Sequence, residues 1–146
     1  MSASKIQLDW VGEHRFDAGR PGGPTLRLDS SGETGQSPVD AVLSALAGCT
    51  SVDVVDILAK RRTPLSRLHV DVTGERANSV PRRLTRILLA YTIDGAGIDR
   101  VHAERAIELA ITKYCSVRDS LARDIVIEWA LTLNGESGVL IKVAAG

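Results

Sequence analysis

The longest apolar segment of the chain covers residues 37–62, SPVDAVLSALAGCTSVDVVDILAKRR, and predicts a long helix. Ser37 is suited to the N-cap and Pro38 to the first helical turn, while Pro64 stops any continuation. In the first half of this segment, apolar residues occur nearly all the way round the helix: Val39, Ala41, Val42, Leu43, Ala45, Leu46 and Ala47. A helix of this kind is expected to be buried on most of its faces.

Shorter segments on both sides of this helix alternate apolar and polar residues, as half-buried strands do. The predicted strands before the helix are residues 5–11, 14–18 and 25–29, and those after it are residues 68–73, 84–93 and 125–133. Asp99 is placed to cap a second helix that runs on to Tyr114 and Cys115. Residues 116–123 continue it or form a short separate helix, and residues 139–143 add a short edge strand or trail off. The predicted order is βββ-α-ββ-α-β, an α+β fold in one domain over residues 1–146.

Composition narrows the possible functions. The 146 residues carry 18 basic and 18 acidic side chains and few aromatic ones, so neither nucleic acid nor a membrane surface is an expected partner. The first ten residues lack the pattern of a signal peptide, which favours a cytosolic protein. There is no CxxC or HxxxH pair and the three histidines are scattered, so we expect no metal and no cofactor.

The two cysteines are the candidate reactive groups, because in the cytosol cysteines more often serve redox chemistry than a structural disulfide. Cys49 lies midway along the long helix, directly after Gly48, which suggests either tight packing or room to reach the sulfur. Either cysteine could also be a small buried hydrophobic residue without reactivity.

Five other side chains have structural interpretations. Trp10, Tyr114 and Trp129 are expected to pack in the core or at an interface. Glu104 and Glu108 share a helical face by their spacing and are expected to form a solvated edge.

The element order, Cys49 within SPVDAVLSALAGCTSVDVV and Cys115 within KYCSVRDSL together resemble the OsmC/Ohr family of cytosolic thiol-dependent hydroperoxide reductases. The similarity covers roughly residues 5–133. It implies an intertwined homodimer in which N-terminal strands of one subunit join the sheet of the other. It also implies two long helices buried back to back and packed against antiparallel sheets, with active sites at the subunit interface.

The resemblance further implies a two-cysteine peroxidase. Cys49 would attack a small peroxide as the thiolate and become a sulfenic acid, with which Cys115 would condense to a disulfide. An external dithiol would restore both thiols, and lipoylated proteins are the reductants known in the family. A family arginine from the N-terminal region lowers the thiol pKa, and Arg15, Arg20 and Arg27 are the candidates here. Arg20 is favoured because it lies in the glycine- and proline-rich stretch GRPGGP.

Two positions depart from the pattern of the hydroperoxide reductases. Ten positions before the reactive cysteine, where they carry a glutamate, this chain has Val39, and the nearest carboxylate is Asp40. Asp40 either replaces that glutamate or only stabilises the start of the helix, and its place resembles the divergent, YhfA-like branch of the family. Asp53 lies one helical turn after Cys49 and would raise the thiol pKa unless it is itself paired.

Three functions therefore remain open. The favoured one is a thiol peroxidase for organic hydroperoxides or hydrogen peroxide. The alternative is a non-catalytic dimeric binding protein that holds a small apolar or thiol-bearing ligand, and the third leaves both cysteines buried and inert. The distance between the sulfurs of Cys49 and Cys115 discriminates among them, because a disulfide requires Cα atoms within about 7 Å without backbone movement.

Overall fold

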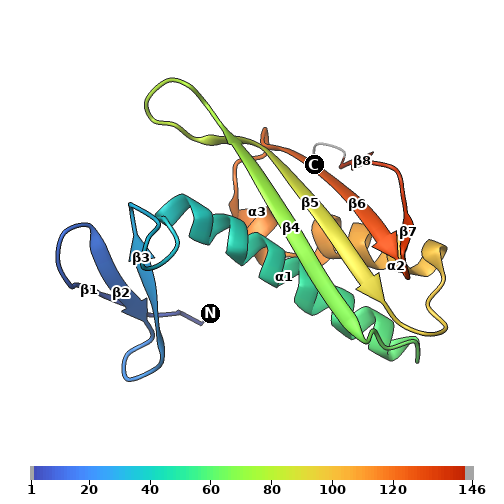
Figure 1. Cartoon of the computed structure of the whole chain (residues 1–146). Helices are drawn as coiled ribbons and strands as arrows, with labels where there is room; N and C mark the ends of the chain where they lie inside the picture. Colours follow the sequence, from blue (N-terminus) through green and yellow to red (C-terminus); the bar gives the residue numbers. More distant parts are fainter. Residues whose placement is uncertain (1, 144–146) are drawn as a thin grey trace. The chain divides into compact units, whose positions relative to one another are not determined.

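The computed structural model describes residues 2–143, and its backbone forms two compact units, one up to Val42 and one from Leu43 onward. Each unit is described by itself below. That the chain is a single domain stays a prediction. The α+β class is confirmed, since helices and sheets both contribute large parts of the structure (Figure 1).

The N-terminal unit contains an antiparallel sheet of three strands in the order β1-β2-β3. Their bounds are Gln7–Trp10 for β1, Arg15–Gly19 for β2 and Thr25–Asp29 for β3. The register pairs Leu8 with Ala18 and Ala18 with Leu26, so alternate apolar side chains share one face of the sheet. Trp10 lies on this face and is 68 % exposed, so it does not pack in the core of the single chain, and its packing at an interface stays a prediction.

Helix α1 covers Pro38–Lys60, and its start follows the predicted cap, because the Ser37 hydroxyl accepts the backbone N–H of Asp40 at 3.2 Å. Its buried residues follow one face at helical spacing: Leu46, Thr50, Val54 and Leu58. On the opposite face Val52 is 60 % exposed and Val55 42 % exposed. The prediction of burial on most faces is therefore wrong for the single chain, because the sheet covers only one side of the helix.

Length and composition alone would also allow α1 to cross a membrane. This is weak evidence, because long apolar helices in the cores of soluble proteins meet the same criterion.

The second unit contains a five-stranded sheet in the order β4-β5-β6-β7, with β8 also paired to β6. The bounds are Arg67–Arg76 for β4, Leu84–Asp94 for β5, Val126–Leu133 for β6, Glu136–Ser137 for β7 and Ile141–Lys142 for β8. Strands β4 and β5 form an antiparallel hairpin, whereas β5 and β6 are parallel. The expectation of purely antiparallel sheets is wrong at this pair, because the helical connection returns the chain to the starting end of the sheet.

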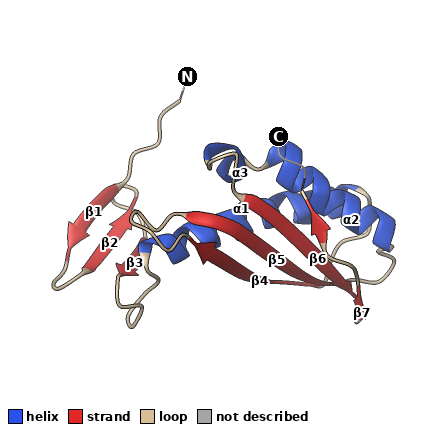
Figure 2. Ribbon diagram, turned by 90° about the horizontal axis from the view of Figure 1, so that it is seen from above, coloured by secondary structure: helices blue, strands red, loops and turns tan. Residues whose placement is uncertain are grey.

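The core of this unit lies between one face of the sheet and the two helices α1 and α2 (Arg100–Leu109), which Figure 2 shows on the same side. Side chains pair across the three long strands, as in the row of the half-buried Val72 with the buried Leu89 and Trp129. Trp129 is buried as predicted, and its indole N–H donates to the Glu108 carboxylate at 3.2 Å. Glu108 is thus tied to the core, and Glu104 pairs with Arg100 at 3.3 Å, so the two do not form a merely solvated edge.

The second helical region differs from the predicted single helix. The Asp99 carboxylate caps α2 as predicted, accepting the His102 N–H at 2.9 Å. The helix then widens into a π-helical turn, η1, over Ala110–Tyr114, and a short helix α3 covers Ser116–Ser120. Cys115 is extended and separates η1 from α3, so it does not lie within the second helix. The observed order adds η1 and β7 to the predicted elements, while α3 and β8 agree with the predicted options of a short separate helix and a short edge strand.

Candidate functional site

Cys49 lies in the middle of α1 and is half-buried. A Cβ atom added at the neighbouring Gly48 would meet nothing within 4 Å, so this glycine does not mark a close approach within the chain. Gly48 was explained either by tight packing or by room to reach the sulfur. In the single chain there is open space beside Gly48, which agrees with the second explanation.

The structure brings the two cysteines together. Cys115 is only 3 % exposed, and its sulfur accepts the backbone N–H of Arg118 at 3.3 Å. Burial raises the pKa of the Cys115 thiol, the backbone N–H of Arg118 lowers it and the neighbouring Cys49 raises it, with a net result of about 11. Near neutral pH Cys115 is consequently a protonated thiol that lies near Cys49.

A pair of buried hydroxyl groups beside the cysteines escaped the sequence analysis. The hydroxyls of Thr50, on α1, and Tyr91, on β5, lie 2.7 Å apart. Burial raises the pKa of Tyr91 to about 12, the hydrogen bond with Thr50 lowers it, and the nearby Cys115 raises it. The available signal was a tyrosine among the inward-facing positions of β5, which are otherwise aliphatic, together with a threonine directly after Cys49.

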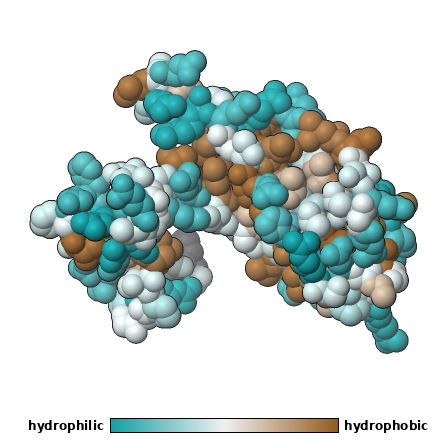
Figure 3. All heavy atoms as spheres, viewed as in Figure 1, coloured by the Kyte–Doolittle hydropathy of each residue, from teal (hydrophilic) through white to brown (hydrophobic). Residues whose placement is uncertain are grey.

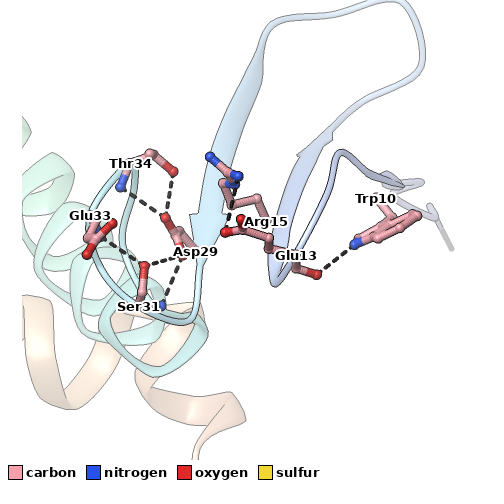
Figure 4. A network of polar contacts seen from close by, with 7 residues as sticks. All are labelled: Trp10, Glu13, Arg15, Asp29, Ser31, Glu33 and Thr34. Atoms are coloured by element: carbon pink, nitrogen blue, oxygen red, sulfur yellow. Dashed lines mark hydrogen bonds and ion pairs between the residues drawn. The ribbon is translucent and has the colours of Figure 1, made fainter.

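The three candidate arginines all lie in the N-terminal unit and differ in their partners. Arg27 binds Asp17 through two hydrogen bonds of 2.5 and 3.2 Å, which lower the pKa of Asp17 and raise that of Arg27. Arg15 pairs with Glu13 at 3.2 Å (Figure 4), and its Nε is buried without a hydrogen-bond partner. Arg20 is exposed in the turn between β2 and β3. Arg15 and Arg27 are therefore each paired with a carboxylate, and the assignment to Arg20 stays a prediction.

The loop that leads into α1 is built around the buried carboxylate of Asp29. It accepts the backbone N–H groups of Ser31 and Thr34, both at 3.0 Å, and their hydroxyls at 2.8 and 2.6 Å (Figure 4). These hydrogen bonds hold the pKa of Asp29 well below its usual range. The start of α1 is thus fixed by local polar contacts.

The two acidic residues on α1 lie in different surroundings. Asp40 is exposed in the first turn, and whether it replaces the family glutamate stays a prediction. Asp53 is half-buried and lines a groove of about 450 Å³ between α1 and α2. This groove combines apolar side chains with charges of both signs: Ile57, Ala106, Leu109, Tyr114, Asp53, Asp56, Lys60, Arg61, His102 and Arg105.

A second, smaller pocket of about 270 Å³ lies at the end of η1 and along α3, and Cys115 is among its lining residues. Within residues 2–143, no three histidine, cysteine or acidic side chains gather in a way that could hold a metal ion. The reactive groups that the structure places at the site are two thiols and the hydroxyls beside them.

The structure is thus an α+β fold with a mixed sheet, and its candidate site contains two neighbouring cysteines, one of them on a long apolar helix. Residues 30–130 match the family model described as OsmC-like protein, and the chain belongs to this family. It is 34 % identical to Protein YhfA of Escherichia coli K12 over 124 residues, which cover 84 % of this chain and 92 % of that protein.

Solved structures agree with this fold. The OsmC-like protein from Mycoplasma pneumoniae superposes with a TM-score of 0.78 at 19 % identity, covering 90 % of this chain and 97 % of that one. The organic hydroperoxide resistance protein OhrB of Bacillus subtilis gives a TM-score of 0.58 at 14 % identity, covering 90 % and 98 %. The predicted resemblance to the OsmC/Ohr family and its YhfA-like branch is confirmed.

Proposed function

We propose that the protein is a cytoplasmic thiol peroxidase that reduces organic hydroperoxides or hydrogen peroxide, with Cys49 peroxidatic and Cys115 resolving. The observation that carries this proposal is the proximity of Cys49 and Cys115, the two cysteines of the chain, since Cys49 is among the groups that raise the pKa of the Cys115 thiol. The organic hydroperoxide resistance for which the Bacillus subtilis protein is named agrees with it, although that likeness shows only the fold.

The proposed reaction uses the two thiols in turn. The Cys49 thiolate attacks one peroxide oxygen, the O–O bond breaks, and the alcohol or water leaves with a proton, so that Cys49 becomes a sulfenic acid. The sulfur of Cys115 then attacks the Cys49 sulfur, and the hydroxyl group leaves as water with the Cys115 proton. Burial raises the pKa of Cys115, so it remains a thiol during the first step and does not compete for peroxide. A dithiol, in the family a lipoylated protein, would return two electrons.

The remaining parts of the proposed site come from the N-terminal unit and the start of α1. Arg20 would favour the Cys49 thiolate with its permanent positive charge, and Asp40 would orient that arginine. Arg20 is exposed, and among residues 2–143 no carboxylate pairs with it as Asp17 pairs with Arg27, which supports the choice.

A homodimer is part of the proposal. Val52 and Val55 on α1 and Leu8 and Trp10 on β1 are large apolar side chains that the single chain leaves exposed. Figure 3 shows apolar surface on both parts of the chain. Exposed apolar surface of this kind is typical of protein interfaces, and a second copy would cover it.

A second candidate function is the non-catalytic binding of a small ligand. The observation that favours it is the groove of about 450 Å³ between α1 and α2, whose apolar side chains and charges could hold an amphiphilic molecule. In that case Cys49 would be a packing residue without turnover.

Intact-mass analysis distinguishes the two functions. Reduced protein receives one equivalent of cumene hydroperoxide, and Cys49→Ser and Cys115→Ser are treated alongside. The peroxidase predicts loss of two hydrogens in the wild type, a sulfenic acid in Cys115→Ser and no change in Cys49→Ser. Ser51→Ala, next to the site but without a thiol, should behave as the wild type. Intact thiols in the wild type while the peroxide persists would refute the peroxidase and leave the binding protein.

A further inference from the structure

The pocket of about 270 Å³ beside Cys115 has a strongly positive lining. Three cationic side chains, Lys113, Arg118 and Arg123, line it together with Cys115, against the single carboxylate of Asp119. A cavity that combines a thiol with an excess of positive charge favours a small anion that reacts with sulfur.

Contacts on the rim hold two of these cations in place. The Lys113 ammonium lies 5.4 Å from the centroid of the Tyr114 ring, and the Arg118 guanidinium donates to the carbonyl of Ala122 at 3.1 Å. Arg123 pairs with Asp119 at 2.8 Å, so the one acidic group is already neutralised by a lining cation. Lys113 and Arg118 remain as uncompensated positive charge around the pocket.

We propose that this pocket binds a small anionic thiol that reduces a Cys49–Cys115 disulfide by attacking the sulfur of Cys115. The proposal rests on the two-cysteine function proposed above and adds the place and the charge of the reductant. The larger groove between α1 and α2 is a poorer entrance, because Cys115 is not among its lining residues.

The exchange proceeds in two balanced steps. The reductant thiolate bonds to the Cys115 sulfur, the disulfide breaks, and the electron pair leaves on Cys49, which takes a proton. A second thiolate then attacks the reductant sulfur of the mixed disulfide and expels Cys115, which takes a proton, so the reductant leaves as a disulfide after giving two electrons.

The order of attack follows from the surroundings of Cys115. Its burial raises its pKa to about 11, which makes it a poor leaving group. Attack at Cys115 expels Cys49 first and leaves the difficult expulsion of Cys115 to the second step. In a dithiol that second step is intramolecular and is helped by a high effective concentration.

The first experiment measures the pocket without peroxide or disulfide. In Cys49→Ser the remaining cysteine is Cys115, which is labelled at about pH 9 and low salt with an anionic (ethylsulfonate) or a cationic (ethyltrimethylammonium) methanethiosulfonate. Each rate is divided by the rate of the same reagent with a simple thiol. We expect the anionic reagent to be favoured about tenfold, as two nearby positive charges would give in water.

Charge variants connect this preference to the pocket. Lys113→Gln/Arg123→Gln in the same background should bring the normalised ratio close to one. Arg67→Gln/Arg82→Gln removes the same net charge from exposed positions outside the pocket and should leave the ratio unchanged. Equal or faster labelling by the cationic reagent, or a Cys115 that reacts only after unfolding, would overturn the proposal.

The second experiment locates the attack. The disulfide is formed with diamide and reduced with mercaptoethanesulfonate, and the mixed disulfide is trapped with acid and mapped on tryptic peptides. The adduct should lie on residues 114–118, which contain Cys115. An adduct on Cys49 would overturn this inference alone and leave the peroxidase standing, whereas failure of diamide to form the disulfide would overturn both.

Discussion

The hydrogen bond between Thr50 and Tyr91 leads to an asymmetric prediction for two conservative substitutions. The Thr50 hydroxyl lies 3.1 Å from the carbonyl of Ala47, to which it donates, so its proton is already used. Tyr91 must then donate to Thr50 across their 2.7 Å contact. Thr50→Val removes the acceptor and leaves a buried donor without a partner, whereas Tyr91→Phe removes a donor and leaves Thr50 with its bond to Ala47.

The magnitudes follow from this difference. A buried donor that loses its acceptor costs about 1–3 kcal/mol, and Tyr91 is only 1 % exposed, so we expect the upper half of this range for Thr50→Val. A typical neutral hydrogen bond contributes about 1 kcal/mol net, which is our expectation for Tyr91→Phe. In the double variant no donor is orphaned, so its loss should be smaller than the sum of the single losses.

Urea unfolding of the reduced protein at about pH 7 and one fixed protein concentration measures these free energies. The fixed concentration matters, because a dimer gains stability with concentration. A loss for Tyr91→Phe that equals or exceeds the loss for Thr50→Val would refute the assigned direction of the hydrogen bond. Strictly additive losses would show that the two hydroxyls do not interact.

Three further predictions concern pH, the N-terminal loop and the dimer. Since the folded pKa values of Cys115 and Tyr91 are raised, their contribution to stability is present below the unfolded values and is lost as pH rises through about 11 and 12. The free energy of unfolding measured with urea should therefore fall above pH 9, by up to about 1.4 kcal/mol per pH unit for Tyr91. Tyr91→Phe should flatten the upper part of this plot of unfolding free energy against pH. Asp29→Asn should speed amide exchange in residues 30–36 without changing that of β5, and equal exchange in the loop would contradict the role given to this carboxylate. Val52→Glu should give a monomer by light scattering, while Val139→Glu, at another exposed apolar position, should not; a dimeric Val52→Glu would exclude α1 from the interface.

Helix caps and strands were predicted well where a structural feature depends on neighbouring residues in the sequence. Ser37 and Asp99 cap their helices as their side chains suggest, and the alternation in residues 84–93 matches β5. The parallel pairing of β5 and β6 could not be predicted in this way, because alternation is the same in parallel and antiparallel strands. The π-helical turn was missed because the apolar pattern continues through residues 110–114 while the backbone widens.

The candidate site was predicted only in part. Cys49 and Cys115 stood out by residue type and by resemblance, but their proximity depends on the crossover that brings the end of η1 back to α1. Thr50 and Tyr91 are 41 positions apart, and only the packing of α1 on the sheet reveals that they pair. Likewise, α1 has the composition of a buried helix, but composition does not say which surface buries it.

The position of the two cysteines also has a consequence for the lifetime of the protein. They lie about 66 positions apart, and β4, β5 and α2 all fall between them. A disulfide would close these elements in one loop and restrict the unfolded chain, which by loop entropy amounts to about 4 kcal/mol for a loop of this length. The oxidised protein would therefore resist heat and proteases better than the reduced one. Oxidant exposure would lengthen its survival, and the return of reductant would open it to degradation.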